Sequence, residues 1–109
     1  MEFQHTSVLL TESIAALVTD KSGVYVDCTM GGAGHSLAIA SFLDAEGHLV
    51  SIDQDTAAIA AGRQRLAQAA CKITVVHDNF RNLNAILDSL DLDMIDGALF
   101  DLGVSSHQL

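Results

Sequence analysis

Short apolar runs along the chain alternate with longer segments in which apolar residues recur every three or four positions. A short continuous run is typical of a strand buried on both faces, and the wider spacing is typical of a helix that covers a sheet. The runs predict strands at residues 23–28, 48–52, 72–77 and 95–100. The spacing predicts a leading helix at 10–18 and connecting helices at 37–43, 55–70 and 83–90. Strands that alternate with helices favour an α/β fold with a doubly wound parallel sheet.

Acidic residues mark the end of every predicted strand. They are Asp27, Asp53, Asp78 and Asp101. The carboxyl ends of parallel strands meet at one edge of the sheet, and ligands of such folds bind at that edge. Acids placed at random on the surface would not coincide with all four strand ends. The pattern therefore predicts a ligand site at the carboxyl edge.

The first predicted strand leads into a glycine-rich turn and then a helix, over residues 25–36 (YVDCTMGGAGHS). Glycines in such a turn let a ligand approach main-chain N–H groups and a helix N-terminus. The turn completes neither register of the dinucleotide fingerprint G-x-G-x-x-G, and it lacks the lysine of a P-loop. Its charged groups are Asp27 and, when protonated, His35, which suits a ligand with a positive centre better than a pyrophosphate. The turn favours S-adenosylmethionine over NAD, although tight packing alone also selects glycines at such turns.

Two further residues suit a nucleoside ligand. Asp53, at the end of the second strand, is placed to accept both ribose hydroxyls, as acids do in dinucleotide folds. The alternative is an acid that favours the next helix N-terminus, although Asp55 already serves that purpose. Phe80 could stack on an adenine, or it could be a core residue beneath the following helix.

Composition narrows the partners. The chain has 109 residues, enough for one domain, and a net charge of −9 with only five scattered basic residues. A nucleic-acid backbone normally needs a basic patch, so this segment is not expected to hold one. The two cysteines form no C-x-x-C pair, and no leader or membrane-span pattern is present, which predicts a reducing cytoplasm. The histidines show no metal spacing, and the acids Asp88, Asp91, Asp93 and Asp96 are expected to be solvated surface.

Five motifs together resemble one family, the bacterial small-subunit ribosomal RNA cytosine-N4 methyltransferases. They are His5–Glu12 (HTSVLLTE), the glycine turn at 25–36, Asp53-x-Asp55, Asn79-Phe80 and residues 96–106 (DGALFDLGVSS). The matches occur in order and span nearly the whole chain. The resemblance implies a Rossmann-like class I methyltransferase domain with strand order 3-2-1-4. It also implies that S-adenosylmethionine is used to methylate the exocyclic N4 amine of a cytidine in 16S rRNA.

The resemblance also implies a set of site residues. The cofactor contacts carried over by motif are Ala33, Gly34, His35, Asp53, Phe80, Asp101 and Gln108. The glycine turn adds Asp27 and Gly31 as expected cofactor-binding residues, and Asp101 is the candidate catalytic residue, placed to engage the target amine or the methyl donor. No metal is expected.

The resemblance covers only the N-terminal part of the family's domain, without its remaining strands and inserted helical domain. We therefore expect residues 1–109 alone to be inactive, and to self-associate through an exposed edge at the fourth strand. Two other functions remain open on the same fold: an NAD-type oxidoreductase and a non-catalytic Rossmann-like interaction module.

Overall fold

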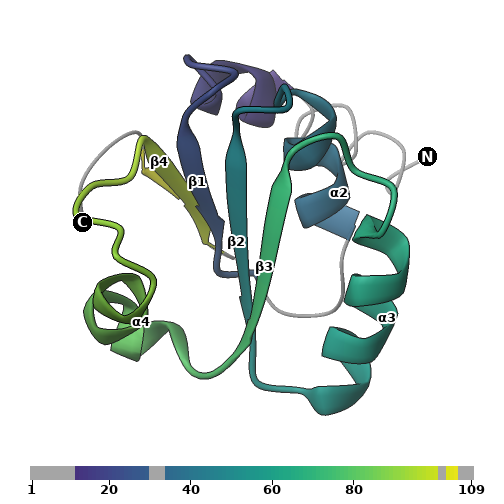
Figure 1. Cartoon of the computed structure of the whole chain (residues 1–109), viewed down its shortest axis with the longest axis vertical. Helices are drawn as coiled ribbons and strands as arrows, with labels where there is room; N and C mark the ends of the chain where they lie inside the picture. Colours follow the sequence, from purple (N-terminus) through teal and green to yellow (C-terminus); the bar gives the residue numbers. More distant parts are fainter. Residues whose placement is uncertain (1–11, 30–33, 101–102, 106–109) are drawn as a thin grey trace.

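The computed structural model describes residues 12–29, 34–100 and 103–105, which form a five-stranded sheet with helices on both faces (Figure 1). The strands are β1 (Val24–Asp27), β2 (His48–Asp53), β3 (Lys72–His77), β4 (Gly97–Phe100) and β5 (Gly103–Ser105). Their order is β3-β2-β1-β4-β5; the first four are parallel, and β5 runs antiparallel to β4. The predicted doubly wound parallel sheet, with order 3-2-1-4, is confirmed.

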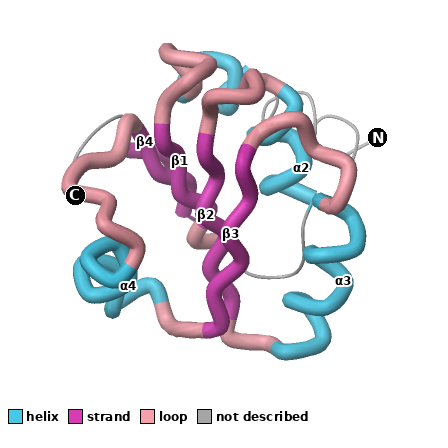
Figure 2. The backbone as a smooth tube through the Cα atoms, viewed as in Figure 1, coloured by secondary structure: helices cyan, strands magenta, loops and turns pink. Residues whose placement is uncertain are grey.

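The helices divide between the two faces of the sheet (Figure 2). One face is covered by α2 (Gly34–Ser41), by α3 (Thr56–Leu66) and by the helical residues 12–17. The other is covered by α4 (Leu83–Ser89), which the short 3₁₀ helix η1 (Phe80–Asn82) precedes. Each connection from a strand through a helix to the next parallel strand is a βαβ unit, which places helices on both faces.

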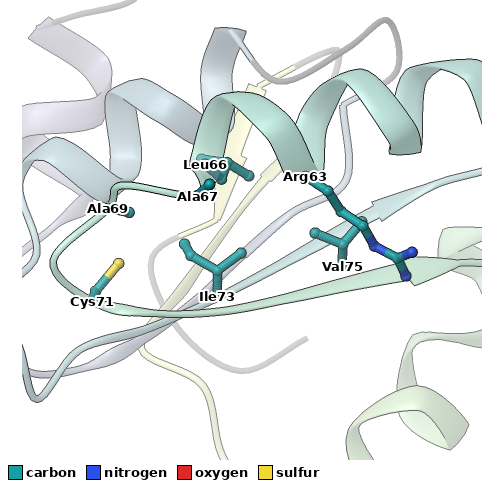
Figure 3. A pocket seen from close by; sticks show the side chains of 7 residues that line it. All are labelled: Arg63, Leu66, Ala67, Ala69, Cys71, Ile73 and Val75. Carbon is teal, nitrogen blue, oxygen red and sulfur yellow. The ribbon is translucent and has the colours of Figure 1, made fainter.

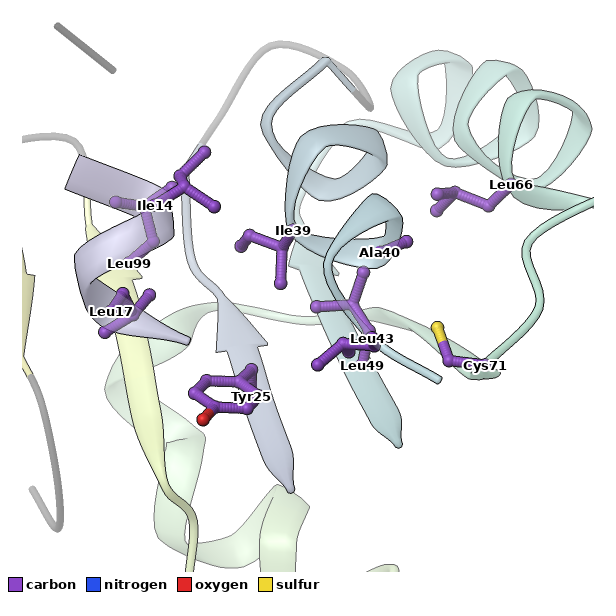
Figure 4. Close-up of a cluster of buried hydrophobic side chains, with 10 residues drawn as sticks. All are labelled: Ile14, Leu17, Tyr25, Ile39, Ala40, Leu43, Leu49, Leu66, Cys71 and Leu99. Atoms are coloured by element: carbon purple, nitrogen blue, oxygen red, sulfur yellow. The ribbon is translucent and has the colours of Figure 1, made fainter. Parts of the chain in front are cut away.

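The period of two along each strand sorts its side chains between two cores. In the first core, Tyr25 and Leu49 pack with Ile39 of α2 and with Ile14 and Leu17 of the leading helix (Figure 4). The second core holds the alternate strand residues together with α4; its buried members are Val26, Cys28, Val50, Ile52, Leu83, Ile86, Leu87, Ile95 and Ala98. Both faces of β1, β2 and β4 are thus buried, as their continuous apolar runs predict, whereas the outer strand β3 is only partly buried.

Several predicted boundaries were too wide. The prediction placed the end of the third helix at Ala70, but α3 ends at Leu66 because the chain turns there, with the Ala69 N–H donating to the Leu66 carbonyl at 3.1 Å. Similarly, α2 ends at Ser41, and β4 begins at Gly97 rather than Ile95. Leu43 and Ile95 are buried outside these elements, so their burial extended the apolar pattern beyond the regular structure.

The predicted open edge at the fourth strand is wrong. Residues 103–105, for which the apolar pattern predicted no strand, form β5, whose register pairs Ala98 with Ser105 and Phe100 with Gly103. Three residues are too few for an alternating pattern to show in the sequence. Because β5 pairs with the far side of β4, the physical argument for self-association through that edge is removed, and nothing in the described residues supports it.

Two expectations about the chain as a whole can be checked within its described part. No helix there is long and apolar enough to cross a membrane. Cys28 and Cys71 are buried in different cores, on opposite faces of the sheet, so no disulfide joins them.

Candidate functional site

The parallel register brings the strand ends together at one edge of the sheet. Asp27, the last residue of β1, lies opposite Ser51 of β2 and Leu99 of β4. Asp53, the last residue of β2, lies opposite His77, the last residue of β3. Asp27, Ser51 and Asp53 share the sheet face that α2 covers, because the side chains of a strand alternate between faces. The acids that sequence reasoning singled out on β1 and β2 therefore lie at the predicted edge and on one face.

Asp27 is buried, with 1 % of its surface exposed, and it organises the turn after β1. Its Oδ1 accepts hydrogen bonds from the Thr29 amide at 2.9 Å and from the Thr29 hydroxyl at 2.6 Å. Its Oδ2 accepts from the Ser36 hydroxyl, at 2.5 Å, which ties the first turn of α2 to the end of β1. The Thr29 hydroxyl also lies 3.0 Å from Nδ1 of His35.

Burial raises the pKa of Asp27 above its ordinary value of 3.8, and the hydrogen bonds from Ser36 and Thr29 partly oppose that rise. Three internal donors already use both carboxylate oxygens. This geometry fits a group that shapes the turn beneath a ligand. The prediction that Asp27 itself contacts a cofactor stays a prediction.

Unlike Asp27, Asp53 has a carboxylate oxygen that is left to accept a hydrogen bond from a ligand. It is 7 % exposed, and its Oδ1 accepts from the Asp55 amide at 3.0 Å. Among the described residues no donor contacts Oδ2. Asp55, not Asp53, is the N-cap of α3, and its carboxylate accepts from the Ala57 amide at 2.9 Å. The structure therefore disfavours the helix-capping alternative for Asp53.

Phe80 is not a core residue beneath α4, because 45 % of its surface is exposed. It opens η1, whose N-cap Asn79 accepts from the Arg81 amide. Its ring meets Phe100, at the end of β4, edge to face, with centroids 5.7 Å apart. The contact with Phe100 thus fixes the position of the Phe80 ring, and the exposed part of that ring is accessible to a flat ligand.

The structure adds residues that the sequence did not single out as members of a site. Ser51 lies 2.9 Å from Ser36, oxygen to oxygen, and Thr29 belongs to the same buried cluster. His77 Nε2 lies 3.0 Å from the Gln54 carbonyl and braces the turn that follows Asp53. Ser51 stands two positions before Asp53, so the period of two in the strand was the available signal.

Four predicted site residues lie outside the described residues: Gly31, Ala33, Asp101 and Gln108. Gly34 is the first residue of α2 and His35 the second. Within the described part of the chain, no three His, Cys, Asp or Glu side chains form a group suited to a metal ion.

A hollow of about 410 Å³ lies elsewhere, between α3 and the outer strand β3 (Figure 3). Its walls are Arg63, Leu66, Ala67, Ala69, Cys71, Ile73 and Val75. It starts at the amino end of β3 and stops two residues before the strand ends, and no carboxylate lines it. It is therefore separate from the carboxyl edge and offers little of the chemistry expected there.

The order of the strands and the chemistry at their carboxyl ends define a Rossmann-like α/β fold of the methyltransferase type. A crystal structure of a candidate rRNA methylase from Clostridium thermocellum has the same fold, with a TM-score of 0.71 and 21% identity over 83% of this chain and 47% of that one. The O-methyltransferase TomG from Streptomyces achromogenes, in complex with SAM, has a TM-score of 0.58 and 21% identity over 84% of this chain and 42% of that one. At these identities the likeness concerns the fold alone.

The chain belongs to the MraW methylase family, whose model matches residues 2–109. It is 52% identical, over its full 109 residues, to ribosomal RNA small subunit methyltransferase H of Clostridium botulinum, and 50% identical to the protein of that name from Lachnospira eligens. It spans about a third of the length of these relatives, 35% in each case. The predicted membership of a small-subunit rRNA methyltransferase family is confirmed, and the cytosine-N4 specificity stays a prediction.

Proposed function

We propose that this chain binds S-adenosylmethionine at the carboxyl edge of its sheet. We further propose that it forms the cofactor-binding part of an enzyme that methylates the N4 amine of a cytidine in 16S rRNA. The second statement rests on the resemblance of its motifs and on the names of its relatives as small-subunit rRNA methyltransferases.

One observation carries the cofactor proposal: an oxygen acceptor and an exposed aromatic ring stand on neighbouring strand ends of the same edge. Asp53 ends β2 with Oδ2 unmatched among the described residues, and Phe80 follows the end of neighbouring β3 with nearly half of its surface exposed. An adenosine group presents a ribose diol and a flat base, which these two groups suit. At the end of β1, the hydrogen bond from Ser36 to Asp27 ties the turn after that strand to α2.

The remaining site residues keep roles that the resemblance implies. Gly31, Ala33 and Gly34 would let main-chain N–H groups approach the methionine part of the cofactor, and Gln108 and Asp101 would complete the site from the segment after β4. When bound, S-adenosylmethionine supplies an activated methyl group. Among the residues of this chain, Asp101 is the one we propose to orient the target amine or the methyl donor.

Orientation matters for this reaction because the lone pair of the cytosine N4 amine is delocalised into the ring. A weak nucleophile gains most from being held in line with the methyl group, with its base turned out of the RNA stack. The net charge of −9 makes this segment a poor surface for the RNA backbone. We therefore assign most rRNA contacts to the part of the relatives that this chain does not span, and the place of the reaction to the reducing cytoplasm.

Calorimetric titration of this chain with S-adenosylmethionine and, separately, with NADH tests the cofactor proposal. We expect binding of the first and none of the second; the reverse result would favour an oxidoreductase, and binding of neither would favour an interaction module. Methyl transfer from labelled S-adenosylmethionine to small ribosomal subunits tests the reaction in a chimera in which this chain replaces the matching 35% of the Clostridium botulinum relative. The relative itself is the positive control, and this chain alone is expected to be inactive. A modified nucleotide other than N4-methylcytidine would overturn the proposed chemistry.

A further inference from the structure

A chain of hydrogen bonds joins the buried carboxylate of Asp27 to the half-buried imidazole of His35. Its members are Ser51, Ser36, Asp27, Thr29 and His35, from β1, β2, α2 and the turn between them. Ser36 is fully buried and Thr29 nearly so, whereas the two end members, Ser51 and His35, are only partly buried. The directions of these hydrogen bonds decide what His35 can offer to a ligand.

The protons of the two hydroxyl groups next to Asp27 are committed to its carboxylate. An ionised carboxylate only accepts hydrogen bonds, and each hydroxyl has a single proton to donate. The Ser36 hydroxyl donates to Oδ2 at 2.5 Å, so across the 2.9 Å separation it must accept from the Ser51 hydroxyl. The Thr29 hydroxyl likewise donates to Oδ1 at 2.6 Å, which leaves its oxygen only as an acceptor on the other side.

That acceptor faces Nδ1 of His35 at 3.0 Å, so Nδ1 must carry the proton. In a neutral imidazole one nitrogen donates and the other accepts, and the partner of one nitrogen determines the state of the other. His35 is therefore the Nδ1–H tautomer, with Nε2 as a hydrogen-bond acceptor. Imidazole in water prefers the opposite tautomer, so the arrangement has a measurable signature.

We propose that Thr29 is a positioning residue that holds His35 as the Nδ1–H tautomer, so that Nε2 accepts a hydrogen bond from the α-ammonium group of S-adenosylmethionine. This inference rests on the proposed cofactor. It assigns His35 a specific atom and a specific partner, and it gives Asp27 a function through Thr29 without direct contact to the ligand. An acceptor nitrogen at this turn favours a positively charged amine, which has N–H groups to donate. An ionised phosphate has no hydrogen-bond donor to offer it.

The tautomer is tested without any cofactor. Long-range ¹⁵N–¹H correlation spectra of the histidine-labelled chain, with His35 assigned through His35→Gln, report which ring nitrogen carries the proton. At a pH where the imidazole is neutral, we expect Nδ1–H in the wild type and in Thr29→Ser, which keeps the hydroxyl. Thr29→Val keeps the shape without the hydroxyl and should shift His35 toward Nε2–H. An Nε2–H tautomer in the folded wild type overturns the proposal.

The consequence for binding is tested by calorimetry on the same variants. Thr29→Val should raise the Kd for S-adenosylmethionine by roughly 3- to 10-fold, the range for one lost hydrogen bond. Thr29→Ser should bind the cofactor as tightly as the wild type does. Circular dichroism checks that both variants fold. Wild-type affinity in a folded Thr29→Val variant overturns this inference and leaves the proposed function standing. Absence of binding in the wild type instead overturns the proposed cofactor, and with it the partner we assign to Nε2.

Discussion

The two ends of the sheet both carry acids, yet they use them differently. At the amino end, Asp20, Asp44 and Asp96 accept hydrogen bonds from backbone amides of their own turns or of the neighbouring strand. At the carboxyl end, Asp27 has donors on both oxygens, whereas Asp53 is buried yet keeps one oxygen without a donor among the described residues. Asp20 and Asp96 also keep one such oxygen, but Asp20 is exposed and Asp96 is only partly buried. An acid at a strand end therefore indicates a site when its side chain is buried and one of its oxygens still lacks a donor, as in Asp53.

The glycines at the amino end have a structural explanation. A Cβ on Gly23 would lie 2.5 Å from Oδ2 of Asp96, and one on Gly47 would lie 2.7 Å from the Lys21 carbonyl. These contacts leave no space for a side chain, so the two glycines serve tight packing between turns. Changes at this end should lower stability, whereas changes at Asp53 and Phe80 should lower ligand affinity.

The largest effect should come from Gly23→Ala. The new methyl group would displace the Asp96 carboxylate, which accepts from the Val24 amide at 2.7 Å and so joins the starts of β1 and β4. Overpacking together with loss of that hydrogen bond should lower the free energy of unfolding by about 3 kcal/mol. Urea unfolding followed by circular dichroism measures it.

A double-mutant cycle sharpens this first prediction. If the Asp96 carboxylate is the obstacle, Gly23→Ala should lower the free energy of unfolding clearly less in an Asp96→Ala background than in the wild type. Equal costs in the two backgrounds would show that Asp96 is not what Gly23 accommodates.

At the opposite end, Asp53→Ala should weaken the binding of S-adenosylmethionine by about 1.5–3 kcal/mol, because the ribose would lose hydrogen bonds to a charged acceptor. This corresponds to roughly a 10- to 150-fold rise in Kd by calorimetry. Asp44→Ala is the matched control, because it removes an acid of the amino end and should leave the affinity unchanged. An equal loss in both variants would mean that overall charge, not the open oxygen of Asp53, governs binding.

A smaller loss of affinity is expected for Phe80→Ala. Removing a stacking ring should cost about 1 kcal/mol of binding, roughly a fivefold rise in Kd. Stability should change little, because 45 % of the side chain is already exposed. Met94→Ala provides the comparison, since Met94 is 74 % exposed but precedes β4 at the amino end. Unchanged affinity in Phe80→Ala would assign Phe80 to the Phe100 contact alone.

The smallest effect concerns pH. Burial raises the pKa of Asp27 above 3.8, so the folded chain holds this proton more tightly than the unfolded chain does. The stabilisation is complete below pH 3.8 and is lost as pH rises through the folded pKa. Asp27→Asn removes this loss, so its stability relative to the wild type should rise with pH across that window in urea unfolding.

Asp44 supplies a control of opposite sign. The hydrogen bond from Ser22 lowers the pKa of Asp44, so its contribution is lost as pH falls. The stability of Asp44→Asn relative to the wild type should therefore decline as pH rises from below toward 3.8, and it should then stay level across the higher window in which Asp27 titrates. Parallel slopes in the two asparagine variants would contradict the contrast between a buried acid and an exposed one.

The sequence by itself determined the order of strands and helices and the edge where chemistry collects. Apolar periodicity reports burial, and a parallel sheet imposes its own topology, so the runs around Tyr25, Leu49 and Ile73 were enough to place the first three strands. Asp53 could be found as well, because it ends a strand and Asp55 was available as the cap. The family motifs added the cofactor and the reaction class.

Only the tertiary structure decided which polar groups are open and which are committed. Asp96 was expected to be solvated, but it is partly buried and accepts from the Val24 amide 72 residues away in the sequence. No local pattern reports that pairing, nor the pairing of β4 with three residues of β5, nor the convergence of Thr29, Ser36 and Ser51 on Asp27. The partner of each polar group depends on distances between different helices and strands, and those distances exist only once the chain has folded.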